Sequence, residues 1–447
     1  MSRHAKVLEL EYKIPTVAGA ASNIVNYAMG YDFMYMNGMP IRYVAFPFPV
    51  AGQPRSVHHQ YIFEGKDKVS GKPMMQAIID ALAKPLTDKE KYKGPAPEAT
   101  AEPRLLKPDT EDNLQRLFKD KDWTDYNPII LPTEARVAAM LKGTSHKPGE
   151  VVKTVNWPGG ARPLTVEKAA ICAVMAGAKP EYFPLILALA KSVPFGNSTS
   201  SMSNMILVNG PIRTQIGMNS GNNAMGPHNE ANSVIGRVFT LMSKTAGGLH
   251  SGVTTWSSLG NTIQYNNLCI AENEEALPAG WEPFHVQTGF KPADSVVTVG
   301  VGWTYISSVG EALRSYPPHM LMRDYMRSLA SLGSRATIVM DPTVAALLKD
   351  AHGFNTKAAL SEWLSASIEK TVASHLGNGV QIGMSTAFAL QGMEPQATWV
   401  KLPPETMIKP FYDPKGIQVV VVGGKIQTTW FVTDFMLGRG ERVDDWR

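Results

Sequence analysis

The sequence predicts an α/β protein with two unequal domains, the first of them incomplete. Short apolar strands alternate with helical segments, and 447 residues exceed what a single hydrophobic core normally supports. Residues 85–128 are rich in Pro and charged residues that cannot support a core. We therefore expect an α/β unit over residues 1–84, a linker with one helix over 85–128, and a large α/β domain over 129–447.

The first unit contains predicted strands at 14–17 and 41–46, a helix over 22–33 and, after a loop, a helix over 73–82 that starts with Pro73. This order is typical of a parallel sheet with right-handed crossovers, as in Rossmann-like and flavodoxin-like folds. Two strands are too few for a stable sheet. Strands from elsewhere must complete it.

The linker and the large domain show clear helix starts and buried strands. Thr110 is the predicted N-cap of the linker helix over 111–121. In the large domain we predict helices at 133–141, 165–178, 180–192, 231–242, 310–332, 342–350 and 356–371, and strands at 205–208, 295–301, 336–340 and 417–422. The last strand has five β-branched residues followed by two glycines, which is typical of a buried parallel strand.

The composition limits the classes of partner. Charged residues make up 18% of the chain, against roughly 25% in an average soluble domain. Interface cores are depleted in charged side chains, so the deficit predicts an oligomer. A net charge of +4 without a basic run argues against nucleic acid. The longest apolar stretch, 169–178, is shorter than the ~20 residues of a membrane span. With no signal-like N-terminus and only two cysteines, we expect a cytoplasmic protein.

The densest polar constellation follows the strand at 205–208. It contains Asn209, Arg213, Asn219, Asn222 and His228. Ligands of open α/β sheets bind beyond the carboxyl ends of strands, Asn supplies donors and acceptors, and Arg can bind a carboxylate or phosphate. We predict that these residues bind a small-molecule substrate. The alternative is a long loop held together by its own Asn turns.

A second polar cluster contains Glu272 and Glu275, with His285 ten residues further on. These side chains could share a divalent cation or act as base and orienting group, so they are the candidate catalytic residues. No known metal spacing is matched, and a solvated acidic turn is the alternative. His250, in the Gly-rich loop 247–252, is a further candidate for substrate binding, with a simple turn as its alternative.

Two other features carry little chemistry. Cys172 and Cys269 have no cationic neighbour in the sequence, which favours small buried hydrophobes over nucleophiles. The segment from Val422 to Lys425 lacks the spacing of a phosphate-binding loop, so no nucleotide is expected. A divalent metal stays open as a cofactor, without an assigned ligand set.

Short landmarks run through both domains. The first unit carries Ile14-Pro15-Thr16-Val17, Gly38-Met39-Pro40-Ile41-Arg42, Phe46-Pro47-Phe48-Pro49 and Ala77-Ile78-Ile79-Asp80-Ala81-Leu82. The large domain carries Leu131-Pro132-Thr133, Gly143-Thr144-Ser145-His146, Thr165-Val166-Glu167-Lys168, Asn209-Gly210-Pro211-Ile212-Arg213, Ala271-Glu272-Asn273-Glu274-Glu275, Trp281-Glu282-Pro283 and Gly423-Gly424. With these, residues 12–84 resemble the C-terminal half of the UGSC-type domain, named after a Sec/Cys-Gly-Ser-Cys motif. Residues 130–424 resemble the region that follows this domain in longer family members.

In the family, the thiol motif lies just before the Ile-Pro-Thr-Val strand. No such motif stands before Ile14 in this sequence. The resemblance therefore implies a second subunit that carries a Cys-Gly-Ser-Cys type motif and completes the first sheet. It implies that this chain is the larger subunit of a heteromeric enzyme that acts on a small molecule. The chemistry would be thiol-dependent, of the redox or lyase type, with the active site at the subunit interface. The alternatives are a metal-assisted lyase or hydrolase using Glu272, Glu275 and His285, and a non-catalytic ligand-binding subunit.

Overall fold

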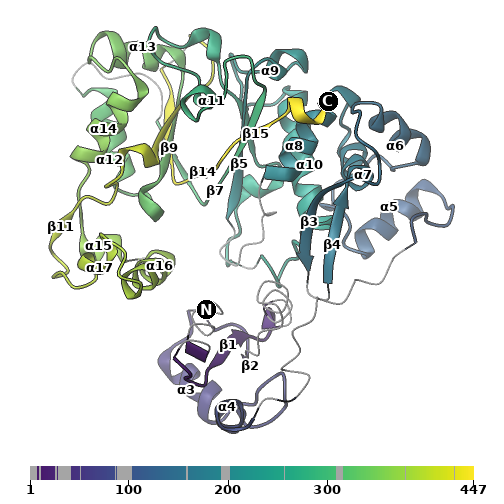
Figure 1. The fold of residues 1–447 in the computed structure, drawn as a ribbon, viewed down its shortest axis with the longest axis vertical. Helices are drawn as coiled ribbons and strands as arrows, with labels where there is room; N and C mark the ends of the chain where they lie inside the picture. The colour runs from purple at the N-terminus through teal and green to yellow at the C-terminus, as the bar shows by residue number, and fades with distance from the viewer. Residues whose placement is uncertain are drawn as a thin grey trace.

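The computed structural model describes residues 8–9, 12–25, 28, 42–50, 52–85, 87, 103–157, 160–192, 202–255, 257–308, 316–377, 379–426 and 428–447. The protein is a mixed α/β protein, with a small N-terminal unit beside a much larger body (Figure 1). Most of the helix predicted over 22–33, and the start of the one predicted over 310–332, lie outside the described residues. No helix within the described ranges is long and apolar enough to cross a membrane.

The N-terminal unit contains a two-stranded parallel sheet of β1 (Val17–Ala21) and β2 (Arg42–Phe46). β1 begins at the end of the strand predicted over 14–17. α4 (Met74–Ala83) starts directly after Pro73, as predicted, and packs Met74 and Ala77 against β2. α3 (Arg55–Phe63) was not predicted, because none of its residues is buried and its sequence therefore lacks an apolar stripe.

The large body begins before residue 129. Thr110 caps α5 (Glu111–Asp120) by accepting a hydrogen bond from the Asn113 amide, as predicted. Phe118 of this helix packs into the core of the large body, and Arg104 forms ion pairs with Glu167 at 2.7 Å and Glu134 at 3.3 Å. The C-terminal part of the predicted linker therefore belongs to the large body.

The first half of the large body is a sheet covered by helices on one face. Its strands lie in the order β14-β7-β5-β6, and β15 also pairs with β7. The strands are β5 (Ser203–Asn209), β6 (Leu268–Ala271), β7 (Val296–Gly302), β14 (Met436–Leu437) and β15 (Glu441–Arg442). The helices are α6 (Glu134–Leu141), α7 (Val166–Ala176), α8 (Phe183–Ser192), α9 (Ile212–Gln215), α10 (Glu230–Thr245) and α11 (Phe284–Gln287). A hairpin of β3 (Val151–Trp157) and β4 (Gly160–Thr165) precedes α7.

The second half repeats this plan with the strand order β12-β9-β13-β8. The strands are β8 (Tyr305–Ser307), β9 (Ala336–Met340), β12 (Ile417–Val421) and β13 (Trp430–Thr433), and the helices are α12 (Pro318–Met326), α13 (Pro342–Asp350) and α14 (Lys357–Ser367). The helix predicted over 356–371 ends early, because residues 370–371 form a strand. A small peripheral group comprises β10 (Lys370–Thr371), α15 (Val372–His375), α16 (Gly379–Leu390), α17 (Gln396–Trp399) and β11 (Met407–Ile408). Single 3-10 turns lie at Pro180–Tyr182, Thr262–Tyr265, Glu274–Ala276, Leu332–Ser334, Pro414–Gly416 and Asp444–Trp446.

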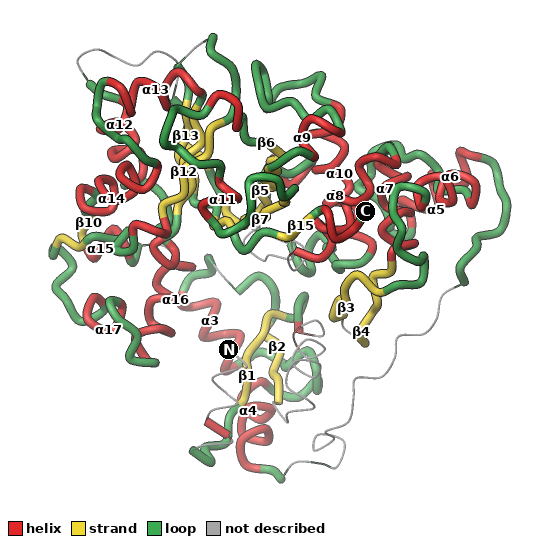
Figure 2. Tube along the Cα trace, turned by 45° about the horizontal axis from the view of Figure 1, so that its top comes forward, coloured by secondary structure: helices red, strands yellow, loops and turns green. Residues whose placement is uncertain are grey.

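The two sheets pack face to face between two helical layers. In β5, Ile206 and Val208 face the helices of the first half, while Met205 and Leu207 face the second sheet. In β9, Val339 faces the first sheet and its neighbours face α12–α14. Alternate residues of a strand point to opposite faces, so each sheet is buried on both sides. Figure 1 shows the layers from left to right as helix, sheet, sheet, helix, and Figure 2 shows the two groups of strands next to each other.

The strand pairing is mixed rather than parallel. β5 pairs in parallel with β6, and β9 with β12, but β7 and β13 run antiparallel to β5 and β9. β12 is parallel and buried as predicted, but it lies at a sheet edge. The backbone N–H of Val421 donates to Glu272 Oε1 and its carbonyl accepts from the Asn273 amide, so the end of this edge strand is covered.

Candidate functional site

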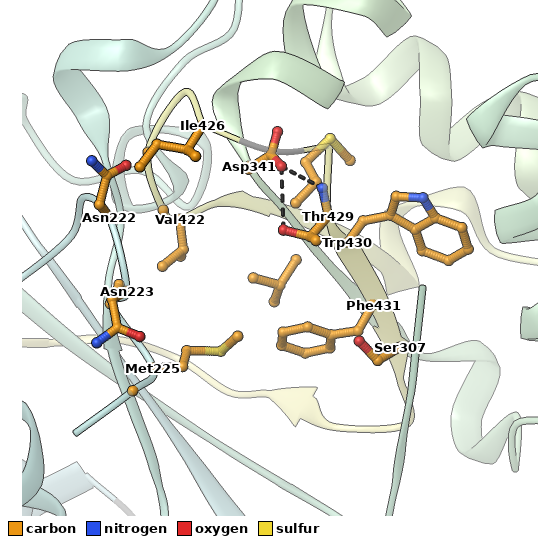
Figure 3. A pocket seen from close by; sticks show the side chains of 16 residues that line it. Asn222, Asn223, Met225, Ser307, Asp341, Val422, Ile426, Thr429, Trp430 and Phe431 are labelled. Atoms are coloured by element: carbon orange, nitrogen blue, oxygen red, sulfur yellow. Dashed lines mark hydrogen bonds between the residues drawn. The ribbon is translucent and has the colours of Figure 1, made fainter. Parts of the chain in front are cut away.

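A pocket of about 370 Å³ lies at the carboxyl ends of β9 and β12. The loop 222–226 faces the end of the second sheet across it, and Figure 3 shows Asn222, Asn223 and Met225 opposite Asp341, Thr429 and Phe431. The lining residues are Asn222, Asn223, Ala224, Met225, Gly226, Ser307, Val339, Met340, Asp341, Val422, Gly423, Gly424, Ile426, Thr429, Trp430 and Phe431.

Asp341 joins three elements around the pocket. It follows β9 directly and caps α13, because its Oδ1 accepts the Val344 amide at 2.8 Å. Its Oδ2 accepts the amide and the hydroxyl of Thr429, the residue before β13. The side chain is 4% exposed, and burial raises its pKa although these hydrogen bonds act to lower it. The carboxylate is thus fixed in place and poorly solvated.

Two glycines shape this wall of the pocket. Gly424 lets the loop 222–226 approach the end of β12, and Gly226 lets that loop fold against its own Asn223. A Cβ atom on Gly424 would lie 1.4 Å from Asn222 Oδ1, and one on Gly226 would lie 2.0 Å from Asn223 Oδ1. The amide of Gly423, whose φ is +101°, donates to the Ser220 carbonyl at 2.8 Å. The glycine pair after β12 therefore holds this wall of the pocket against the Asn-rich loop.

Asn219 shapes the Asn-rich loop rather than the pocket lining. Its side-chain Nδ2 donates to the Asn222 carbonyl at 2.9 Å and to Asn229 Oδ1 at 2.8 Å. Asn229 in turn donates to the Asn223 carbonyl at 2.6 Å. The alternative interpretation, a loop held by its own Asn turns, thus describes how the loop is built. Asn222 lies in the pocket, and His228 lies outside its lining.

The candidate catalytic residue Glu272 lies in a buried network behind the pocket. Its Oε1 accepts Lys357 Nζ at 2.6 Å and the Val421 amide at 3.3 Å. Its Oε2 accepts Asn209 Nδ2 at 2.7 Å and the Phe284 amide at 2.6 Å. Both charged side chains of the Glu272–Lys357 pair are almost completely buried. Glu272 therefore has its acceptor positions filled by this chain's own donors.

Arg213 connects the rest of the second cluster. Its guanidinium contacts Glu274 Oε2 at 3.1 Å and Glu275 Oε1 at 2.9 Å, and this contact lowers the pKa of Glu275. His285 is completely buried, with its Nδ1 3.7 Å from Glu274 Oε1. Its ring nitrogens have no hydrogen-bond partner within the part of the chain that the structure describes. The structure thus brings together Asn209, Arg213, Glu272, Glu275 and His285 from two separate motifs.

The Glu272 network reaches the pocket through its wall. Glu272 binds the amide of Val421, which precedes the lining residue Val422. Asn273 Nδ2 donates to the Gly423 carbonyl at 2.8 Å. The network supports the pocket without lining it.

His250 lies apart from both groups. Its Nδ1 is 2.5 Å from Asp122 Oδ2, and Lys244 Nζ is 2.5 Å from Asp122 Oδ1. Its loop meets the N-terminal unit, because Asn23 Nδ2 donates to the Gly252 carbonyl at 2.8 Å. An imidazole oriented by a carboxylate can transfer protons.

Neither cysteine has the character of a nucleophile. Burial raises the pKa of Cys172 to about 11 and that of Cys269 to about 12, so both thiols stay protonated at neutral pH. Within the described ranges, no group of three or more His, Cys, Asp or Glu side chains could hold a metal ion.

No protein-family model, no characterised protein and no solved structure matches this chain.

Sequence reasoning missed Asp341 and Thr429. A signal for Asp341 exists, because an Asp-Pro pair stands between a predicted strand and a predicted helix, which is where an N-cap and a ligand site occur in α/β sheets. Thr429 precedes a four-residue strand that no pattern marked.

Proposed function

We propose that this chain is the larger, ligand-binding subunit of a heteromeric enzyme, and that a small molecule binds in the Asp341 pocket. The observation that carries the proposal is the position of the pocket at the carboxyl ends of two adjacent parallel strands, with a helix starting at one of them. Small-molecule sites of α/β sheets are typically found there. The mixed lining, apolar apart from a few fixed polar groups, fits this use.

The partner is proposed from the N-terminal unit. Its sheet has only two strands within the described residues, fewer than a stable sheet needs, and Tyr12, Phe63 and Ile79 are more than half or about half exposed. The resemblance to the UGSC-type domain supplies the occupant, a chain with a Cys-Gly-Ser-Cys type motif that completes a Rossmann-like or flavodoxin-like sheet. Because both cysteines of this chain stay protonated, the partner supplies the thiol, and the thiol-dependent chemistry takes place at the interface with the N-terminal unit rather than in the Asp341 pocket.

A pocket-filling substitution tests the ligand site. Met225 is on the loop side of the pocket, points toward Phe431 in Figure 3, and is 55% exposed, so Met225→Trp fills the pocket with little risk to folding. Met393→Trp, at a 48% exposed methionine outside the lining, is the matched control. In a thermal-shift screen of small metabolites, ligands that raise the Tm of wild type and Met393→Trp should bind about tenfold or more weakly to Met225→Trp. Ligands that stabilise all three proteins equally would place the binding site elsewhere.

A second candidate function follows from His250. A partner docked on the N-terminal unit would lie near the loop of His250, whereas α13, which the pocket residue Asp341 caps, lies at the opposite end of the molecule in Figure 1. The Asp122–His250 pair would then be the acid/base group of an active site at the subunit interface, and the pocket would be non-catalytic. In the reconstituted complex, this candidate predicts that His250→Gln strongly lowers turnover and changes the pH profile of the remaining activity, while Met225→Trp does neither.

The alternative of a metal-assisted lyase or hydrolase has no support from the positions of its candidate carboxylates, Glu272 and Glu275. Glu272 is bound by Lys357 and Asn209, and Glu275 by Arg213.

A further inference from the structure

The pocket carries a single charge. Among its sixteen lining residues, all in the described part of the chain, Asp341 is the only one with a charged side chain, and none is basic. The remaining polar side chains are Asn222, Asn223, Ser307 and Thr429. A phosphate or carboxylate ligand would find no cation among these sixteen described residues and would be repelled by Asp341.

The charge of Asp341 is not neutralised inside the protein. Its partners are the Thr343, Val344 and Thr429 amides and the Thr429 hydroxyl, which are all neutral donors. No Lys, Arg or His within the described ranges forms an ion pair with it. Burying a carboxylate that is 4% exposed and lacks a counter-ion is costly, and a bound cation would relieve this cost.

We propose that the ligand of this pocket carries a protonated primary amine that binds Asp341 and an apolar body that packs on Val422, Phe431 and Met225. The inference rests on the proposed function and names the chemical class of the ligand bound at the same site. An ammonium group offers three donors to a carboxylate that already accepts only from neutral groups. The three apolar side chains line the pocket together with Val339 and Ile426.

Three probes of one shape separate the charge from the apolar body: benzylamine, benzyl alcohol and benzoate. Their dissociation constants are measured by calorimetry with the full chain at neutral pH. Benzylamine should bind at least tenfold more tightly than benzyl alcohol, and benzoate should not bind. Asp341→Asn, which keeps an oxygen for the helix cap, should remove the preference for benzylamine.

Asp434→Asn is the matched control. Asp434 is also a buried carboxylate that accepts backbone amides, from Trp303 and Thr304, but it does not line the pocket. This variant should keep the benzylamine preference. Equal binding of benzylamine and benzyl alcohol, lost in Met225→Trp but unaffected by Asp341→Asn, would overturn the amine assignment and leave the pocket as the ligand site. If none of the three probes binds in a way that Met225→Trp weakens, the proposed function is overturned together with the amine assignment.

Discussion

Glu272 holds four donors at once and is the residue on which the wall behind the pocket depends. Its two oxygens accept from Lys357 of α14, from Asn209 at the end of β5, and from the backbone amides of Val421 in β12 and Phe284 at the start of α11. The carboxylate therefore joins the first sheet to the second half of the molecule. This arrangement explains how a Glu and a Lys are buried together in the core.

Removing Lys357 should destabilise the protein strongly. Lys357→Met keeps the length of the side chain but leaves the Glu272 carboxylate without its cation, which typically costs about 3 kcal/mol or more at a buried pair. Urea unfolding of the single variants and of the double variant Glu272→Gln/Lys357→Met measures the coupling. The double variant should be more stable than the sum of the single losses predicts. Simple additivity would mean that the two charges do not depend on each other.

The proximity of the two polar motifs could be predicted from the residue pattern. Asn209 and Glu272 each follow a strand, and the carboxyl ends of parallel neighbours meet at one edge of a sheet. That donors of this chain would fill the acceptor positions of Glu272 could not be predicted, because Lys357 belongs to a helix 85 residues further along the chain. The sequence pattern therefore indicated a cluster of catalytic side chains where the structure has a buried network.

At the scale of elements, helices with local start signals were predictable and short strands were not. Thr110, Thr133 and Thr165 each accept the amide three residues on, as their positions before apolar periodic segments indicate. β13, β14 and β15 have two to four residues each, too few to show a period. Their places depend on partner strands that lie far away in the sequence.

The turn after β12 should tolerate no side chain at Gly424. In Gly424→Ala, the new Cβ would overlap Asn222, so the Asn-rich loop must move and the free energy of unfolding should fall by about 1–3 kcal/mol. Ligand binding in the Asp341 pocket should weaken as well, since Asn222 and Gly424 both line it. Gly149→Ala, where a Cβ meets no atom within 4 Å, is the control and should change neither quantity. Unchanged stability and binding in Gly424→Ala would show that the loop is not held against this turn.

At the scale of the whole molecule, the two halves of the large body exchange strands. β8 follows β7 of the first sheet in the chain but pairs with β13 in the second sheet, and β14 follows β13 but pairs with β7. Each half otherwise contains a strand, a helical crossover, a parallel neighbour and an antiparallel strand on the other side. This related topology has no visible repeat in the sequence, because the two halves bury different side chains at matching positions. Asn209 at the end of β5 and Asp341 directly after β9, for example, lie at matching positions of the two sheets.

The N-terminal unit takes no part in this exchange, and its removal should improve the behaviour of the isolated chain. The N-terminal unit exposes the apolar side chains of Phe63 and Ile79 beside its two-stranded sheet, whereas the large body, with Arg104 already bound to Glu167, has both of its sheets covered. We expect the chain produced without its partner to aggregate or to be unstable. A variant comprising residues 103–447 should be a soluble monomer that unfolds in one cooperative transition, as measured by size-exclusion chromatography and calorimetry. It should also retain the ligands of the Asp341 pocket, because none of the lining residues precedes Asn222. If the shortened variant aggregates more than the full chain, the N-terminal unit stabilises the large body, and its exposed apolar side chains are not the surface that requires a partner.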